Sequence, residues 1–74
     1  MVKHTRIICD PAVMAGKPVI RGTRMTVEHI LRELGAGATI EALLTSFPHL
    51  TRDDILAAQA FAADQIANEE IVFG

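Results

Sequence analysis

The sequence predicts a mainly helical domain, in which three helices spaced like a helix-turn-helix follow a short two-stranded β segment. After residue 25, apolar residues recur at helical spacing in three segments, each opened by a threonine. Before residue 26, short β-prone runs alternate with proline and glycine turns. We therefore expect a single domain over residues 1–74, with a β and turn segment at 1–25, a three-helix bundle at 26–67 and a tail at 68–74.

Two β-prone runs precede the helices. The run RIIC at residues 6–9 ends at Asp10-Pro11, because proline lacks the N–H that a β ladder needs. The run VIR at residues 19–21 lies between a turn at residues 16–18 and a second turn at Gly22. We expect the two runs to pair across residues 10–18.

The first two helices are predicted from capping residues and from one apolar face each. Thr26 can cap a helix over residues 27–34 and Thr39 a helix over residues 39–47, since a threonine oxygen accepts a hydrogen bond from the first turn. Gly35 and Gly37 end the first helix, and Pro48 stops the second. The apolar faces consist of Val27, Ile30, Leu31 and Leu34 in the first helix and Ile40, Leu43, Leu44 and Phe47 in the second.

The third helix, over about residues 52–67, is capped by Thr51, with Asp54 at the capping-box position. Its apolar residues surround most of the axis, which is typical of a helix covered on more than one side. In so small a domain, we expect a second copy of the chain to supply that cover. Alternatively, alanine simply favours a helix with a solvated face. The residues expected in the dimer contact are Ala57, Ala60, Phe61, Ala63, Asp64 and Ala67.

The size of the chain also favours self-association. A chain of 74 residues buries only about 60% of its unfolded surface, so its core needs support. One cysteine excludes an internal disulfide, and three histidines without zinc-site spacing argue against a metal. Cys9 has no base beside it in sequence and is expected to be a buried thiol. We expect no enzyme activity and no cofactor.

Targeting signals are also lacking in the sequence. No apolar stretch approaches the roughly 18 residues of a membrane span, and residues 1–9 have no apolar run long enough for a signal peptide. We therefore expect a cytoplasmic protein with no membrane contact.

Charge is divided unevenly along the chain. Residues 1–32 carry six basic and two acidic side chains, a sum of +4, whereas residues 33–74 carry one basic and seven acidic side chains, a sum of −6. The basic part could meet phosphate, which the acidic part would repel. Alternatively, the basic and the acidic parts of the chain are both ordinary solvated surfaces.

Two segments are candidates for binding nucleic acid. In a helix-turn-helix, the start of the last helix reads base edges, which here would fall to Arg52 and Gln59. Asp53 and Asp54 disfavour that role, although both also suit the positive end of a helix dipole. In the second segment, GKPVIRGTR at residues 16–24, Lys17, Arg21 and Arg24 could hold phosphate beside turns, or could instead bind carbonyls and acidic groups. This segment is not part of a Walker A loop, which would need glycine at position 11 and serine or threonine at position 18, because both positions are proline.

The run at residues 16–24, followed by Thr26 and Val27, resembles the signature of the domain-of-unknown-function family 433. Gly37, TIE at residues 39–41, FP at 47–48 and LT at 50–51 are similar to its second half. The resemblance covers about residues 6–67 and implies a small bacterial or archaeal antitoxin-like helix-turn-helix protein. Such proteins are often encoded beside a PIN-like nuclease, the presumed toxin. The resemblance supplies no catalytic residues.

Two functions follow as hypotheses. The first is a dimeric, antitoxin-like DNA-binding regulator of a toxin–antitoxin pair. Phosphate contacts would come from Lys3, Arg6, Lys17, Arg21 and Arg24, and base contacts from Arg52 and Gln59. The alternative is an interaction module that neutralises a partner nuclease without binding DNA, using its acidic half and the tail at residues 68–74.

Overall fold

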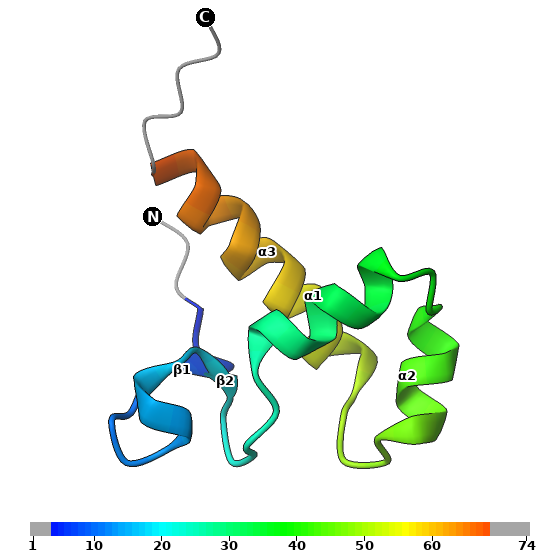
Figure 1. Ribbon diagram of the computed structural model, residues 1–74, viewed down its shortest axis with the longest axis horizontal. Coiled ribbons are helices and arrows are strands. Elements are labelled where there is room, and N and C mark those ends of the chain that lie inside the picture. Colours follow the sequence, from blue (N-terminus) through cyan, green and yellow to red (C-terminus); the bar gives the residue numbers. More distant parts are fainter. Residues whose placement is uncertain (1–3, 69–74) are drawn as a thin grey trace, which may run out of the picture.

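The computed structural model describes residues 4–68 and has a mainly helical architecture (Figure 1). The three helices and the short antiparallel sheet before them confirm the predicted fold class. Residues 1–3 and 69–74, which include Lys3 and nearly all of the predicted tail, lie outside the described residues. The elements are β1 (Ile7–Ile8), a 3-10 turn η1 (Met14–Gly16), β2 (Val19–Ile20), α1 (Val27–Gly35), α2 (Ile40–Ser46) and α3 (Arg52–Asn68).

The strand β2 connects the sheet to the helices. β1 and β2 pair antiparallel, with Ile7 opposite Ile20, as the two β-prone runs predict. On the other side of β2, the Ile20 N–H donates to the Met25 carbonyl at 2.9 Å and the Val27 N–H donates to the Pro18 carbonyl at 2.9 Å. The start of α1 is therefore fixed to β2. The prediction of a buried Cys9 was wrong: β1 ends at Ile8, and the thiol that follows it is exposed.

The turn η1 has an uncommon backbone conformation. Met14, Ala15 and Gly16 have φ angles of 49°, 57° and 83°, all in the left-handed region. Glycine adopts this conformation freely, whereas each L residue with a Cβ costs roughly 1–2 kcal/mol there. The turn leaves the Met14 side chain 45% exposed.

The helix starts follow the capping predictions. Thr26 Oγ1 accepts a hydrogen bond from the His29 N–H at 3.0 Å, and Thr39 Oγ1 accepts one from the Ala42 N–H at 3.0 Å. Both threonines satisfy backbone donors that have no partner inside their helix. Apolar side chains from β1, β2 and all three helices then meet in one core, whose buried members are Ile7, Ile20, Val27, Ile30, Leu43, Leu50, Ile55 and Ala58.

Asp54 joins the start of α3 to β1. Its backbone N–H donates to Thr51 Oγ1 at 3.1 Å, and its Oδ2 accepts from the Thr51 N–H at 3.1 Å, which completes the predicted capping box. Its Oδ1 accepts a hydrogen bond from Arg6 Nη1 at 3.0 Å. Further along α3, Asp64 Oδ2 lies 2.6 Å from His4 Nε2. The N-terminal segment therefore contacts α3 at two places, Asp54 and Asp64.

Asp54→Ala is expected to lower the free energy of unfolding by about 1–2 kcal/mol, because it removes both the cap and the acceptor for Arg6. Asp53→Ala is the matched control. The Asp53 side chain is 72% exposed and lies 3.7 Å from Arg6, whereas that of Asp54 is 10% exposed. Urea denaturation of both variants checks this expectation, and equal losses of stability would contradict it.

Candidate functional site

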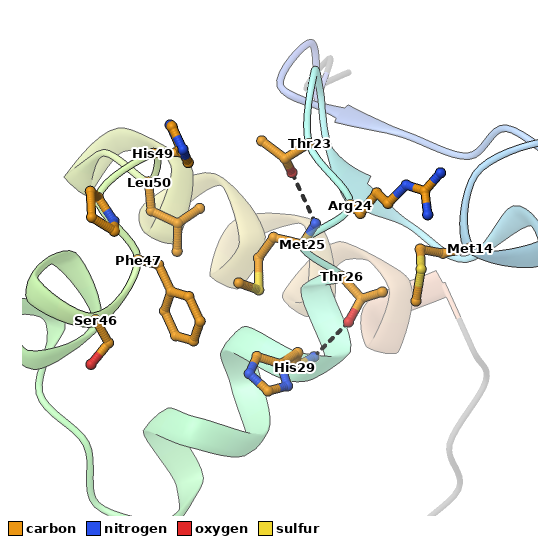
Figure 2. Close-up of a pocket in the computed structure, with 11 residues that line it drawn as sticks. Met14, Thr23, Arg24, Met25, Thr26, His29, Ser46, Phe47, His49 and Leu50 are labelled. Atoms are coloured by element: carbon orange, nitrogen blue, oxygen red, sulfur yellow. Dashed lines mark hydrogen bonds between the residues drawn. The ribbon is translucent and has the colours of Figure 1, made fainter.

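A pocket opens between the segment joining β2 to α1 and the turn joining α2 to α3 (Figure 2). Its volume is about 490 Å³. Figure 2 shows Met25, Phe47 and Leu50 converging on it from the two segments. Histidines and Arg24 lie among the lining residues, so an apolar interior is combined with polar groups around it. This apolar pocket is lined by Met14, Thr23, Arg24, Met25, Thr26, His29, Ser46, Phe47, Pro48, His49 and Leu50.

The turn after β2 is held by Thr23. Its Oγ1 donates to the Ile20 carbonyl at 2.8 Å and accepts from the Met25 N–H at 3.0 Å. Gly22, with a φ of 78°, supplies the left-handed residue that this tight turn requires. The flanking side chains of Arg21 and Arg24 are exposed. The turn therefore places two guanidinium groups on the surface, close together in the chain.

Arg21 and Arg24 line a second hollow with His49, which comes from the turn between α2 and α3. This arginine hollow has a volume of about 550 Å³ and is lined by Arg21, Gly22, Thr23, Arg24 and His49. It shares Thr23, Arg24 and His49 with the apolar pocket, so the two are adjacent. Among residues 4–68, neither arginine has a hydrogen-bond or ion-pair partner for its side chain. Two positive charges are therefore available to an anion.

The other predicted phosphate and base contacts lie elsewhere. Arg6 is held by Asp54, and Lys17 Nζ lies 3.2 Å from Glu28 Oε1. Arg52, at the start of α3, pairs with Glu41 on α2. Gln59 is exposed on α3 without a side-chain partner in the described part of the chain. Of the predicted DNA contacts, the structure thus brings Arg21 and Arg24 together. His49 was not predicted as a site residue, although its place beside Pro48, in the turn before the third predicted helix, was visible in the sequence.

Two carboxylates on the helices, those of Glu28 and Glu41, are paired with cationic side chains. Arg32 and Lys17 hold the pKa of Glu28 below its ordinary value through hydrogen bonds and charge. The pKa of Glu41 is lowered by its own backbone N–H and then by Arg52. Ion pairs therefore neutralise much of the local charge around α1 and α2, and the arginine hollow is not part of them.

The predicted dimer residues of α3 fall on two faces. Ala60, Ala63 and Ala67 are exposed, whereas Ala57 and Phe61 are partly buried against the core. Asp64 is turned to His4. Leu56, which was not predicted, is 48% exposed and lies one helical turn before Ala60. The exposed α3 stripe consists of Leu56, Ala60, Ala63 and Ala67.

Residues 4–68 contain no group of three His, Cys, Asp or Glu side chains that could hold a metal ion. No helix in that range is long and apolar enough to cross a membrane. Every buried side-chain nitrogen or oxygen in the same range has a hydrogen-bond partner.

These features define a small helical protein in which the segment joining β2 to α1 and the turn between α2 and α3 form an apolar pocket, with the arginine hollow beside it. Residues 7–62 match the family described as "Protein of unknown function (DUF433)". The chain belongs to this family.

Two relatives agree with this assignment. The chain is 32% identical over 69 residues to the uncharacterized protein y4eO of Sinorhizobium fredii (strain NBRC 101917 / NGR234), which matches 92% of this chain and 31% of that protein. It is 33% identical to a DUF433 member of Anabaena variabilis ATCC 29413 known from a crystal structure. That match has a TM-score of 0.75 and covers 86% of this chain and 66% of the other. The chain thus spans about a third of the first relative and just under two thirds of the second.

Glu28→Gln is expected to destabilise the fold near neutral pH but not in acid. A carboxylate whose pKa is lowered by folding contributes stability above its ordinary pKa of 4.5, and this contribution is lost as the pH falls through the folded value. Thermal denaturation of wild type and variant across this range measures the difference. Glu33→Gln is the control on the same helix, because Glu33 forms no ion pair with lysine or arginine among residues 4–68. A stability difference that persists in acid would contradict the expectation.

Proposed function

We propose that this protein is a cytoplasmic, antitoxin-like, dimeric DNA-binding regulator that acts with a PIN-like nuclease. The observation that carries the proposal is the arginine hollow beside the turn between α2 and α3. In a helix-turn-helix protein, the start of the last helix lies against DNA, so cations beside that turn are placed to contact the backbone. Arg21 and Arg24 serve as the phosphate contacts, and the resemblance to antitoxin-like proteins supplies the biological setting.

Base reading contributes little to this proposal. Arg52 must leave Glu41 before it can reach a base, and Asp53 is 72% exposed beside it. Gln59 lies two turns further along α3, away from the helix start. Recognition therefore rests mainly on phosphate contacts and DNA shape, with Arg52 and Gln59 as the base contacts that α3 offers.

The dimer contact in this proposal is the exposed α3 stripe. Its residues are spaced by four, three and four positions, so they lie on one side of the helix. An antiparallel pair of α3 helices places Leu56 against Ala67 of the second copy and Ala60 against Ala63 of the second copy. The stripe therefore matches itself under a two-fold rotation, as a symmetric dimer requires. The alanines let the two helices approach closely.

A second candidate function is the neutralisation of a partner nuclease without DNA binding. It is favoured by the ion pairs, because Arg6, Lys17 and Arg52 are already held by carboxylates of the same chain. Co-expression with the product of the neighbouring gene, with and without residues 68–74, tests it. Co-purification that needs this tail, together with no affinity for duplex DNA, would favour this candidate over the first.

Replacing both Arg21 and Arg24 by Gln is expected to weaken binding to a duplex from the region upstream of the gene. The slope of log K against log salt should decrease in magnitude by about 0.9 for each phosphate that the protein no longer neutralises. Fluorescence anisotropy across a salt series measures both quantities.

Arg32→Gln is the matched control for charge, since Arg32 is exposed on α1 and pairs with Glu28. The two-site variant should lose far more affinity than this control. Wild-type binding that is absent, or that does not change with salt, would contradict the proposed function.

Ala63→Glu is expected to dissociate the dimer, because it puts a charge in the centre of the α3 stripe. Gln65→Glu is the control, since it adds the same charge at an exposed position on the opposite side of the helix. Sedimentation equilibrium should give a monomer for the first variant and a dimer for the second. The same mass for both variants would contradict the stripe as the contact.

A further inference from the structure

We propose that residues 69–73 of one copy dock on the second copy of the chain, with Phe73 in the apolar pocket and Glu69 and Glu70 against the arginine hollow. This inference rests on the dimer of the proposed function and adds a ligand for the two adjoining hollows. It also implies that the tail and DNA phosphates compete for the same arginines.

The chemistry of the segment matches that of the two hollows. Its sequence is EEIVF, two carboxylates followed by three large apolar residues. The arginine hollow offers Arg21 and Arg24, which have no carboxylate partner among residues 4–68. The adjacent pocket offers Met14, Met25, Phe47 and Leu50. Because the hollows share Thr23, Arg24 and His49, one short segment can occupy both.

The pocket of the same chain is out of reach. The helix α3 has 17 residues and is therefore about 25 Å long, at about 1.5 Å per residue. The pocket is lined by Leu50, two residues before the first residue of α3, whereas the segment follows the last residue of α3, Asn68. Phe73 is five residues beyond Asn68 and can extend at most about 17 Å from it. Residues 69–73 can therefore reach the pocket of another copy but not that of their own chain.

The antiparallel dimer brings the segment to the correct end. When Ala60 faces Ala63 of the second copy, Ile55 lies level with Asn68 of the second copy. The five residues that follow Asn68 then start beside the first turn of α3, next to Leu50 and the turn between α2 and α3. The pairing that covers the α3 stripe thus delivers residues 69–73 to the apolar pocket.

Another apolar hollow supplies the control. A groove between α1 and α3, lined in part by Leu31, Phe61 and Ile66, has a volume of about 500 Å³. It lies next to the C-terminal end of α3 of the same chain. Ile66 is 58% exposed and Met14 is 45% exposed, so either can become Asp with little cost to the core.

The test uses the full chain with Phe73→Trp, because the natural sequence has no tryptophan and the single indole reports on its own surroundings. Sedimentation measures the dimer in the same samples. We expect the indole emission to shift to shorter wavelength as the dimer forms. Met14→Asp should remove this shift while the dimer persists, and Ile66→Asp should leave it unchanged.

Three results would overturn the inference. The first is emission typical of an exposed indole in a sample that sedimentation shows to be dimeric, which leaves the proposed dimer intact. The second is a shift that is independent of concentration and lost with Ile66→Asp, which indicates docking within one chain. The third is a monomer at every concentration, which would also remove the dimer from the proposed function.

A charge exchange tests the polar half of the contact. Arg24→Glu and Glu70→Arg should each raise the concentration at the midpoint of the emission shift about two- to fivefold, as expected for an exposed ion pair. Combining the two substitutions should restore the midpoint. Equal effects of the single and combined variants would show that Glu70 does not meet Arg24.

Discussion

The carboxylate of Asp54 is the constraint on which the arrangement of the described chain depends. It closes the capping box at the start of α3 and accepts a hydrogen bond from Arg6, which directly precedes β1. These groups are 48 residues apart in sequence. β2 pairs with β1 and is also hydrogen-bonded to the start of α1. The Asp54 contact with Arg6 therefore helps to position the sheet, α1 and the turn that carries Arg21 and Arg24.

The basic side chains fall into two groups, those that pair with carboxylates of the same chain and those that are free to bind an anion. Arg6, Lys17 and Arg52 are each within ion-pair distance of a carboxylate elsewhere in the chain, so their charges are already paired. Arg21 and Arg24 lie on a tight turn, and among residues 4–68 neither pairs with a carboxylate. The charge difference between the two halves of the sequence therefore overstates the number of cations available to a ligand. Among residues 4–68, the arginine and lysine side chains without a carboxylate partner are Arg21 and Arg24.

Local signals in the sequence were sufficient for the fold class and for most element boundaries. Threonine caps, glycines and Pro48 act within a few residues, so Thr26, Thr39 and Thr51 could be placed in advance. Tertiary pairings could not be predicted in this way, because no periodicity in the sequence indicates that Arg6 contacts Asp54 or that Arg52 contacts Glu41. Of the candidate site, Arg21 and Arg24 were visible as neighbours in sequence, whereas His49 and Met14 reach the same surface from segments far apart in the chain. The exposure of Cys9 was missed because strand length is set by pairing and not by propensity.

The shortness of β1 has a consequence for how copies of this protein meet. A sheet edge is a template for unintended pairing, because its free N–H and C=O groups accept a strand from any chain. Here the outer strand is only two residues long, and Pro11 follows soon after with no N–H to offer. Edge-to-edge pairing that leads to aggregates is therefore disfavoured at this edge of the described sheet.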